Sequence, residues 1–244
     1  MSDASDILRV ENLVAGYTRD LPILRSVNLS LRRQTVTVII GPNGAGKSTL
    51  IKAIAGLVPV SAGSVHLGSR DITGIRPDQL GGLGIAYVPQ NDNIFRTLTI
   101  KQNLLLTLRK VATATGRLEE LFALFPVLND KQDDKAGSLS GGQRQMLAVA
   151  MALSTSPSVI LMDEPSAGLS PKAAQEVLQL ARSLTGTGVS VLLVEQNVNQ
   201  ALHVSDHCYI LAEGRNQIDG PAEHMLSDST VADIYLGGRR VKAS

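Results

Sequence analysis

Short runs of apolar and β-branched residues recur along the chain and predict strands. An alternation of period two is clearest at Val27, Leu29 and Leu31. We expect strands over residues 7–13, 27–31, 36–40, 64–67, 85–88, 159–162 and 189–194, and a hairpin of 208–211 with 216–218. Segments of helical periodicity lie between them, and we expect helices over residues 50–55 (beginning near Lys47), 100–108, 118–125, 140–153 and 171–184.

Strands that alternate with helices predict an α/β fold with a mainly parallel sheet that is covered on both faces. Strand-like runs are absent between residues 91 and 156, where helical patterns take over. We therefore predict one domain over residues 1–244, with a core formed by 1–90 and 157–244 and a helical subdomain at 91–156 inserted into it.

The composition is that of a globular protein, because 43% of the 244 residues are hydrophobic and 18% are charged. The net charge of +1 argues against a protein that mainly binds nucleic-acid backbones, so we expect no nucleic-acid partner. The single cysteine, Cys208, excludes an internal disulfide and fits a reducing compartment.

No run approaches the roughly 20 apolar residues that span a bilayer. The first six residues are polar and acidic, unlike a secretory signal. We expect a cytoplasmic chain whose role at a membrane, if it has one, comes through a partner.

The most specific motif is the glycine-rich segment between the predicted strand 36–40 and the helix that follows it. Its spacing, G-x-x-x-x-G-K-S, is that of a phosphate-binding loop. Glycines let the backbone turn N–H groups toward phosphate oxygens, and the helix N-terminus adds the positive end of its dipole. Lys47 would reach the β- and γ-phosphates, and the Ser48 hydroxyl would bind Mg²⁺. The predicted nucleotide-binding residues here are Gly41, Pro42, Asn43, Gly44, Ala45, Gly46, Lys47, Ser48 and Thr49.

Two carboxylates, Asp163 and Glu164, stand at the end of the apolar run 159–162. In parallel sheets the carboxyl ends of the strands are where ligands bind. Asp163 would hold Mg²⁺, directly or through water, and Glu164 would act as general base on the attacking water.

A third motif, L-S-G-G-Q, opens the predicted helix 140–153. Ser140 is a favourable N-cap residue, and Gly141 and Gly142 expose backbone N–H groups at the positive end of the helix. Together with Gln143 they form a second candidate anion site in a chain that already has one.

These three motifs, in this order and separation, resemble the nucleotide-binding subunit of an ATP-binding cassette (ABC) transporter. The resemblance extends from about residue 7 to residue 238. It implies a P-loop NTPase fold of the RecA type with N-terminal antiparallel strands, and an ATPase that uses Mg²⁺ and couples hydrolysis to transmembrane transport. In this family two subunits form a head-to-tail dimer around two ATP molecules, so residues 140–143 would serve the γ-phosphate in the partner's loop.

The resemblance also implies roles for residues outside the three motifs. Tyr17 matches the aromatic residue that stacks on adenine, although a half-buried loop tyrosine is the alternative. Gln90 matches the glutamine that contacts Mg²⁺ and the attacking water, and the loop after it leads into the helices that dock on the membrane subunits. Residues 166–170 match the short loop that crosses the dimer interface.

Two positions depart from the family pattern. Many cassettes carry an aspartate where this chain has Ser170. The histidine that usually follows the strand after the catalytic glutamate is replaced by Gln196, whose amide can donate a hydrogen bond to the γ-phosphate but cannot carry an imidazolium charge. The histidines of the chain stand elsewhere and are interpreted as surface or sheet-edge residues: His66, His203, His207 and His224. The candidate catalytic residues are Lys47, Glu164 and Gln196, and the candidate metal ligands are Ser48, Gln90 and Asp163.

Three further segments, at 94–104, 194–202 and 235–238, resemble importers of branched-chain amino acids and their relatives for urea and short amides. Such a subunit would pair with an identical or a different cassette, bind integral membrane permease subunits at the cytoplasmic face of the inner membrane, and serve an extracytoplasmic solute-binding protein indirectly. A GTPase or a kinase would not explain L-S-G-G-Q. A cassette ATPase without a transport role, such as the iron–sulfur assembly ATPase, stays the alternative.

Overall fold

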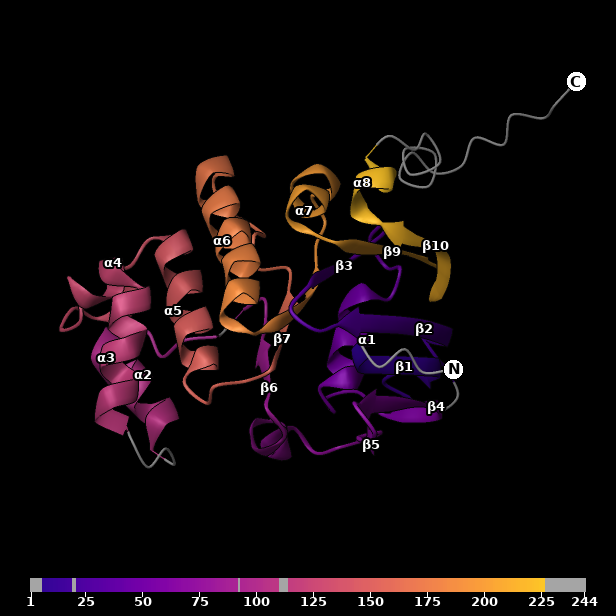
Figure 1. Ribbon diagram of the computed structural model, residues 1–244, viewed down its shortest axis with the longest axis horizontal. Helices are drawn as coiled ribbons and strands as arrows, with labels where there is room; N and C mark the ends of the chain where they lie inside the picture. The colour runs from indigo at the N-terminus through magenta and orange to yellow at the C-terminus, as the bar shows by residue number, and fades with distance from the viewer. Residues whose placement is uncertain (1–5, 19–20, 92, 110–113, 227–244) are drawn as a thin grey trace, which may run out of the picture.

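A six-stranded sheet runs through the centre of the molecule (Figure 1). The computed structural model describes residues 6–18, 21–91, 93–109 and 114–226. The strand order is β10-β9-β3-β8-β7-β6, and the paired neighbours are parallel except for β9 and β10. The strands are β3 (Val36–Ile40), β6 (Ile85–Val88), β7 (Val159–Asp163), β8 (Ser190–Val194), β9 (His207–Ala212) and β10 (Arg215–Pro221). The predicted mainly parallel sheet is confirmed.

Both faces of this sheet are buried, because side chains of the central strands alternate between two hydrophobic cores. In β7, Ile160 and Met162 lie in one core and Leu161 lies in the other. The first core also takes the apolar sides of α6 (Pro171–Leu184), α7 (Val198–Val204) and α8 (Ala222–Met225), and the second takes α1 (Lys47–Ile54).

A second sheet closes the other side of α1. It is antiparallel, with the order β2-β1-β4-β5, and its strands lie at one end of the molecule in Figure 1. The strands are β1 (Asp6–Ala15), β2 (Leu24–Arg32), β4 (Val60–Leu67) and β5 (Arg70–Asp71).

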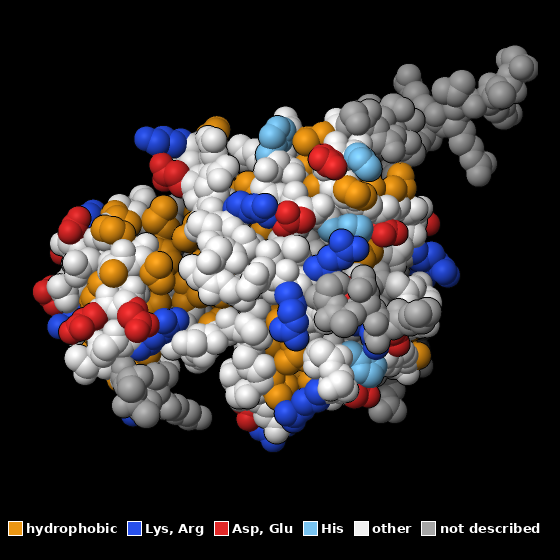
Figure 2. Space-filling view, in the orientation of Figure 1, with side chains coloured by type: hydrophobic (Ala, Val, Ile, Leu, Met, Phe, Trp, Pro, Cys, Tyr) orange, Lys and Arg blue, Asp and Glu red, His pale blue; other side chains and the backbone are white. Residues whose placement is uncertain are grey.

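The helices between residues 100 and 153 gather at the opposite end of the longest axis (Figure 1), and we call this part the helical end. They are α2 (Ile100–Leu108), α3 (Ala114–Leu124), α4 (Pro126–Asn129), η3 (Ala136–Ser138) and α5 (Gly141–Leu153). The surface is hollowed between the helical end and the body of the molecule (Figure 2). A cavity of about 730 Å³ lies there between Thr107, Thr155 and the short 3-10 helices η1 (Pro77–Gln79) and η2 (Gly81–Leu83).

Short elements were not predicted from the sequence. They are β5, α4, α7, α8 and the 3-10 helices, including η4 (Thr185–Thr187). Most have too few residues to complete a recognisable hydrophobic period. The segment 235–238 lies outside the described residues. Among the helices that the structure describes, none combines the length and the apolar character that crossing a membrane requires.

Candidate functional site

The candidate site lies where the carboxyl ends of β3, β8 and β7 stand side by side. The phosphate loop follows β3, Glu195 and Gln196 follow β8, and Glu164 follows β7. Parallel pairing of β3 with β8 and of β8 with β7 places these three segments at one edge of the sheet. The strand order therefore assembles residues that are up to 155 positions apart, as between Gly41 and Gln196.

The phosphate loop has the shape that its glycines predict. Gly44 has a φ of 80°, and no atom lies within 4 Å of where a Cβ would stand, so this part of the loop is open. Gly46 is the N-cap of α1 with a φ of 98°. Lys47 is buried and spans the loop, donating from Nζ to the carbonyl oxygens of Gly41 (2.8 Å) and Pro42 (3.3 Å).

The pKa of Lys47 is shifted by the surroundings of its side chain. Burial lowers the pKa of its ammonium group, while the negative charges of Glu164, Asp163 and Glu195 raise the pKa in opposition. The Lys47 ammonium and the N–H groups of the open glycine loop suit the negative charge of a triphosphate, and the neighbouring carboxylates suit a cation that accompanies it.

Asp163 is the candidate metal ligand at the end of β7. It is 1% exposed, and its Oδ1 has no hydrogen-bond partner. Its Oδ2 accepts a hydrogen bond from the Tyr87 hydroxyl (3.3 Å) and lies 3.8 Å from Nζ of Lys52. Burial raises the pKa of the carboxyl, and the Ser48 hydroxyl and the Lys52 ammonium oppose the rise.

These oxygen donors fit Mg²⁺. A buried carboxylate oxygen without a partner, next to the Ser48 hydroxyl, is the chemistry that this hard cation prefers. Among the described residues there is no cluster of three His, Cys, Asp or Glu side chains that could hold a metal. Mg²⁺ commonly binds through one or two protein oxygens and completes its coordination with phosphate oxygens and water.

Glu164 is held in place from two sides. Its backbone has a φ of 48°, a left-handed conformation that costs a non-glycine residue about 1 kcal/mol or more. Its backbone N–H donates to the carbonyl of Val194 at the end of β8 (2.9 Å). Its Oε2 accepts from the side-chain amides of both Gln90 (3.0 Å) and Gln196 (2.7 Å). The three side chains that the sequence nominated separately are thus in direct contact.

A cavity of about 390 Å³ joins these groups to the phosphate loop. It is lined by Ile23, Asn43, Gly44, Ala45, Gly46, Lys47, Ser48, Thr49, Gln90, Glu164 and Gln196. Tyr17 is 59% exposed and is not among the lining residues, whereas Ile23 is. None of the described lining residues is a histidine. The side chains of His66, His203 and His207 instead bond to Ser64, Asn199 and Asp219.

The L-S-G-G-Q segment lies at a different place. Ser140 and Gln143 form a capping box at the start of α5, with the Gln143 N–H donating to Oγ of Ser140 and Oε1 of Gln143 accepting from the Ser140 N–H. Gly141 lines another cavity, of about 400 Å³, together with the loop 167–169. A Cβ on Gly141 would lie 2.7 Å from Cδ2 of Leu169, so this glycine lets α5 approach the loop closely. A Cβ on Gly142 would lie 3.1 Å from Cβ of Ala173, so this glycine lets α5 approach the start of α6. The chain does not bring these residues to its own phosphate loop.

Sequence reasoning missed two residues of the site. Glu195 is buried, and its carboxylate accepts hydrogen bonds from Ser166; the only sequence signal was a second acidic residue directly after an apolar strand. Tyr87 gave no signal, because its role depends on the pairing of β6 with β7. Ser170, where many cassettes have aspartate, caps α6 by accepting from the Ala173 N–H (3.4 Å).

Comparison with known proteins gives a consistent result. Residues 24–167 match the family profile described as ABC transporter. A probable branched-chain amino acid transport ATP-binding protein, LivF, of Archaeoglobus fulgidus is 41% identical, over 95% of this chain and 99% of the relative. The high-affinity branched-chain amino acid transport ATP-binding protein BraG of Pseudomonas aeruginosa is 34% identical, over 92% and 97%. The lipopolysaccharide export system ATP-binding protein LptB of Acidithiobacillus ferridurans is 33% identical, over 96% and 98%.

Solved structures agree with these relatives. The ADP conformation of an ATP-binding cassette of an ABC transporter has a TM-score of 0.85 and 32% identity, covering 95% of this chain and 99% of its own. A dimeric ATP-binding cassette in a post-hydrolysis state, bound to ADP and Pi, has a TM-score of 0.76 and 25% identity, covering 88% and 98%.

Proposed function

This chain belongs to the ABC transporter family of ATP-binding cassettes, and from that membership we propose that it hydrolyses ATP in a paired assembly to power import of branched-chain amino acids or related small polar solutes. The observation that carries the proposal is the meeting of Lys47, Gln90, Glu164 and Gln196 in one cavity with the phosphate loop. This arrangement supplies a cation for the phosphates and a carboxylate for the water.

The proposed reaction is in-line attack of water on the γ-phosphorus. Glu164 accepts a proton from the attacking water while the oxygen of that water forms the new bond to the γ-phosphorus. The bond between the γ-phosphorus and the bridging oxygen breaks, and ADP leaves with that electron pair. Lys47 stabilises the negative charge on the phosphate oxygens, and Gln196 donates a hydrogen bond toward the γ-phosphate. Mg²⁺, held by Ser48, Gln90 and Asp163, would neutralise charge on the β- and γ-phosphates.

We propose that the nucleotide site is completed by a second cassette, identical to this chain or different. None of the L-S-G-G-Q residues Ser140, Gly141, Gly142 and Gln143 lines the cavity at the phosphate loop, and Gly141 lines a different one. A head-to-tail pair would bring them to the γ-phosphate of the partner. The similar cassette that is dimeric when bound to ADP and Pi supports pairing of two such subunits. Tyr17, whose side chain is 59% exposed, is proposed to stack on adenine once the nucleotide is bound.

Permease subunits at the cytoplasmic face of the membrane are the proposed partners of the helical subdomain 91–156, which is carried on the core 1–90 and 157–244. The loop after Gln90 presents Phe95, whose side chain is 55% exposed. Asn103, fully buried in α2, fixes this loop by accepting from the Phe95 N–H (2.8 Å) and donating to its carbonyl (3.0 Å). An exposed aromatic residue that is held in place five residues after Gln90 suits a contact that senses the nucleotide.

The substrate class rests on relatives alone. Two of the relatives described above are named for branched-chain amino acid transport and one for lipopolysaccharide export, and the 41% identity belongs to the first group. Urea and short amides are the related alternative within import. An extracytoplasmic binding protein would deliver the solute without touching this chain.

The test is affinity purification from membranes, followed by uptake assays with branched-chain amino acids, urea and short amides. We expect permease subunits to co-purify and uptake to require ATP. A Phe95→Ala variant should co-purify less permease while binding ATP normally. Leu57→Ala, at a 48% exposed leucine outside the helical subdomain, is the matched control. A soluble scaffold partner in place of a membrane complex would contradict the transport proposal.

A further inference from the structure

Glu195 is a buried carboxylate for which the hydrolysis mechanism has no use. It directly follows β8 and is 1% exposed. Both of its oxygens are hydrogen-bonded: Oε1 accepts from the Ser166 N–H (3.0 Å), and Oε2 accepts from the Ser166 hydroxyl (2.8 Å) and the Gln196 N–H (3.2 Å). Burying a carboxylate is unfavourable unless its oxygens are hydrogen-bonded, and these three donors meet that need.

The three donors belong to two segments that are separate in the sequence. Ser166 begins the loop 166–170 that follows Glu164, and Gln196 is the residue whose amide bonds to Oε2 of Glu164. Glu195 therefore holds the backbone N–H groups of Ser166 and Gln196, which belong to the two segments on either side of the general base. Its backbone N–H donates to the carbonyl of Ile39 (3.2 Å), which anchors it to the strand that leads into the phosphate loop.

We propose that Glu195 is a positioning residue that locks Gln196 to the loop 166–170, so that the Gln196 amide meets Glu164 only when this loop is in place. The inference rests on the proposed function, because it assigns a role within ATP hydrolysis. The loop in turn packs against the start of the L-S-G-G-Q helix, where Leu169 lies beside Gly141. Contacts thus connect Gly141, Leu169, Ser166, Glu195, Gln196 and Glu164 in one continuous series within the chain.

This arrangement has a functional consequence for a paired assembly. A nucleotide that binds against Gly141 from the partner cassette would act on the loop 166–170 through Leu169. Because Glu195 bonds to both Ser166 of the loop and Gln196, a shift of the loop moves Gln196. The Gln196 amide in turn contacts Glu164, which belongs to the chain's own nucleotide site. A rigid, fully hydrogen-bonded carboxylate suits this role better than an apolar residue, because it fixes direction as well as distance.

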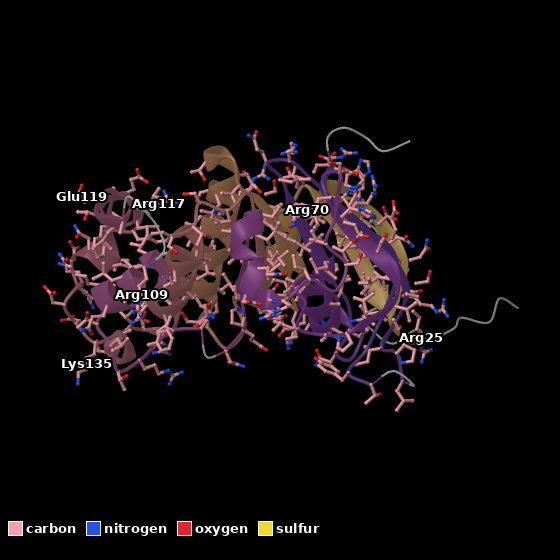
Figure 3. All side chains as sticks on the ribbon, turned by 90° about the horizontal axis from the view of Figure 1, so that it is seen from below. Arg25, Arg70, Arg109, Arg117, Glu119 and Lys135 are labelled. Carbon is pink, nitrogen blue, oxygen red and sulfur yellow. The ribbon has the colours of Figure 1, made fainter. Side chains whose placement is uncertain are left out.

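The test uses the assembled transporter purified from membranes, with MgATP as the ligand. Glu195→Gln keeps the shape but replaces one acceptor oxygen by an NH₂ group that faces a donor. We expect kcat to fall at least about tenfold, with the Kd for ATP within about twofold of wild type. Ser166→Ala removes one donor and should lower kcat several-fold, again without loss of ATP affinity. Glu176→Gln, at an exposed glutamate of α6 and outside the helical end that carries Glu119 in Figure 3, is the matched control and should match wild type.

The decisive measurement is the double variant Glu195→Gln with Gln196→Ala. If Glu195 acts through Gln196, the double variant has the kcat of Gln196→Ala alone, whereas independent roles multiply the two losses. Multiplied losses, or unchanged kcat in both Glu195→Gln and Ser166→Ala, would overturn the proposal. If Glu195→Gln does not fold, Ser166→Ala takes its place. Combined with Gln196→Ala, it should then have the kcat of Gln196→Ala alone, and multiplied losses would overturn the proposal. The proposed function fails separately, by absence of ATP hydrolysis in the wild-type transporter.

Discussion

The side-chain amide of Gln196 donates a 2.7 Å hydrogen bond to Oε2 of Glu164. The Gln90 amide donates to the same oxygen at 3.0 Å, so both glutamines hold one oxygen of the proposed general base. Oε1 is the oxygen that neither amide occupies. Gln196 occupies the position where the family usually has a histidine. Unlike an imidazole, its amide contacts the carboxylate without adding a charge that changes with pH.

Replacing Glu164 by Gln should nearly abolish turnover while ATP binding stays intact. The amide keeps the size of the side chain but cannot accept the proton of the attacking water, and loss of a general base costs about 10²- to 10⁴-fold. Steady-state ATP hydrolysis and retention of bound nucleotide measure the two effects, with Glu176→Gln as control. Unchanged hydrolysis would remove Glu164 from the catalytic role.

Gln196→Ala should lower kcat in the assembled transporter by at least about tenfold, because it removes a hydrogen-bond donor at the reacting groups. Gln175→Ala, at an exposed glutamine of α6, is the control. Full ATPase activity of Gln196→Ala would mean that another residue does the work of the missing histidine.

Tyr87→Phe should lower the free energy of unfolding by about 1 kcal/mol, because it removes the hydroxyl that donates to the buried Asp163. Tyr17→Phe removes a hydroxyl from an exposed ring and should leave stability unchanged. Urea denaturation of both variants without nucleotide measures the difference. Equal stability of the two variants would show that the 3.3 Å contact contributes nothing.

Cys208 should resist thiol reagents at pH 8 until the protein unfolds. Burial raises the pKa of its thiol to about 12, whereas a cysteine in an unfolded chain ionises near about 8.5. Between these values the unfolded chain has lost a proton that the native chain keeps, so this group makes the free energy of unfolding fall as the pH rises.

Because Cys208 is the only cysteine of the sequence, labelling reports one site. We expect little labelling of native protein at pH 8 and full labelling in denaturant. Rapid labelling of the native protein would contradict the burial of β9. The decline of stability between about pH 9 and pH 12 should be shallower in Cys208→Ala, which lacks the titrating group.

Much of the fold follows from local pattern. The strands 36–40 and 85–88 and the helices 100–108 and 171–184 have the boundaries expected from the sequence, because apolar periodicity, Pro171 and the Thr99 cap act within a few residues. β1, β2 and β4 extend beyond their predicted ranges, since backbone pairing continues through polar residues such as Arg25 in β2. Short elements such as α4 and α7 are too brief to be told from loops by pattern.

By itself the sequence determined the chemistry: a phosphate loop, two carboxylates after a buried strand, and a second glycine-rich helix start. These are local because each needs only adjacent residues of the right type. Only the tertiary structure decided which of them meet. The Gln90 and Gln196 amides meet on Oε2 of Glu164 because β7 lies between β6 and β8. Glu195 reaches Ser166 because β8 pairs with β7. Strand order is set by the packing of both sheet faces against helices, so no local spacing reveals it.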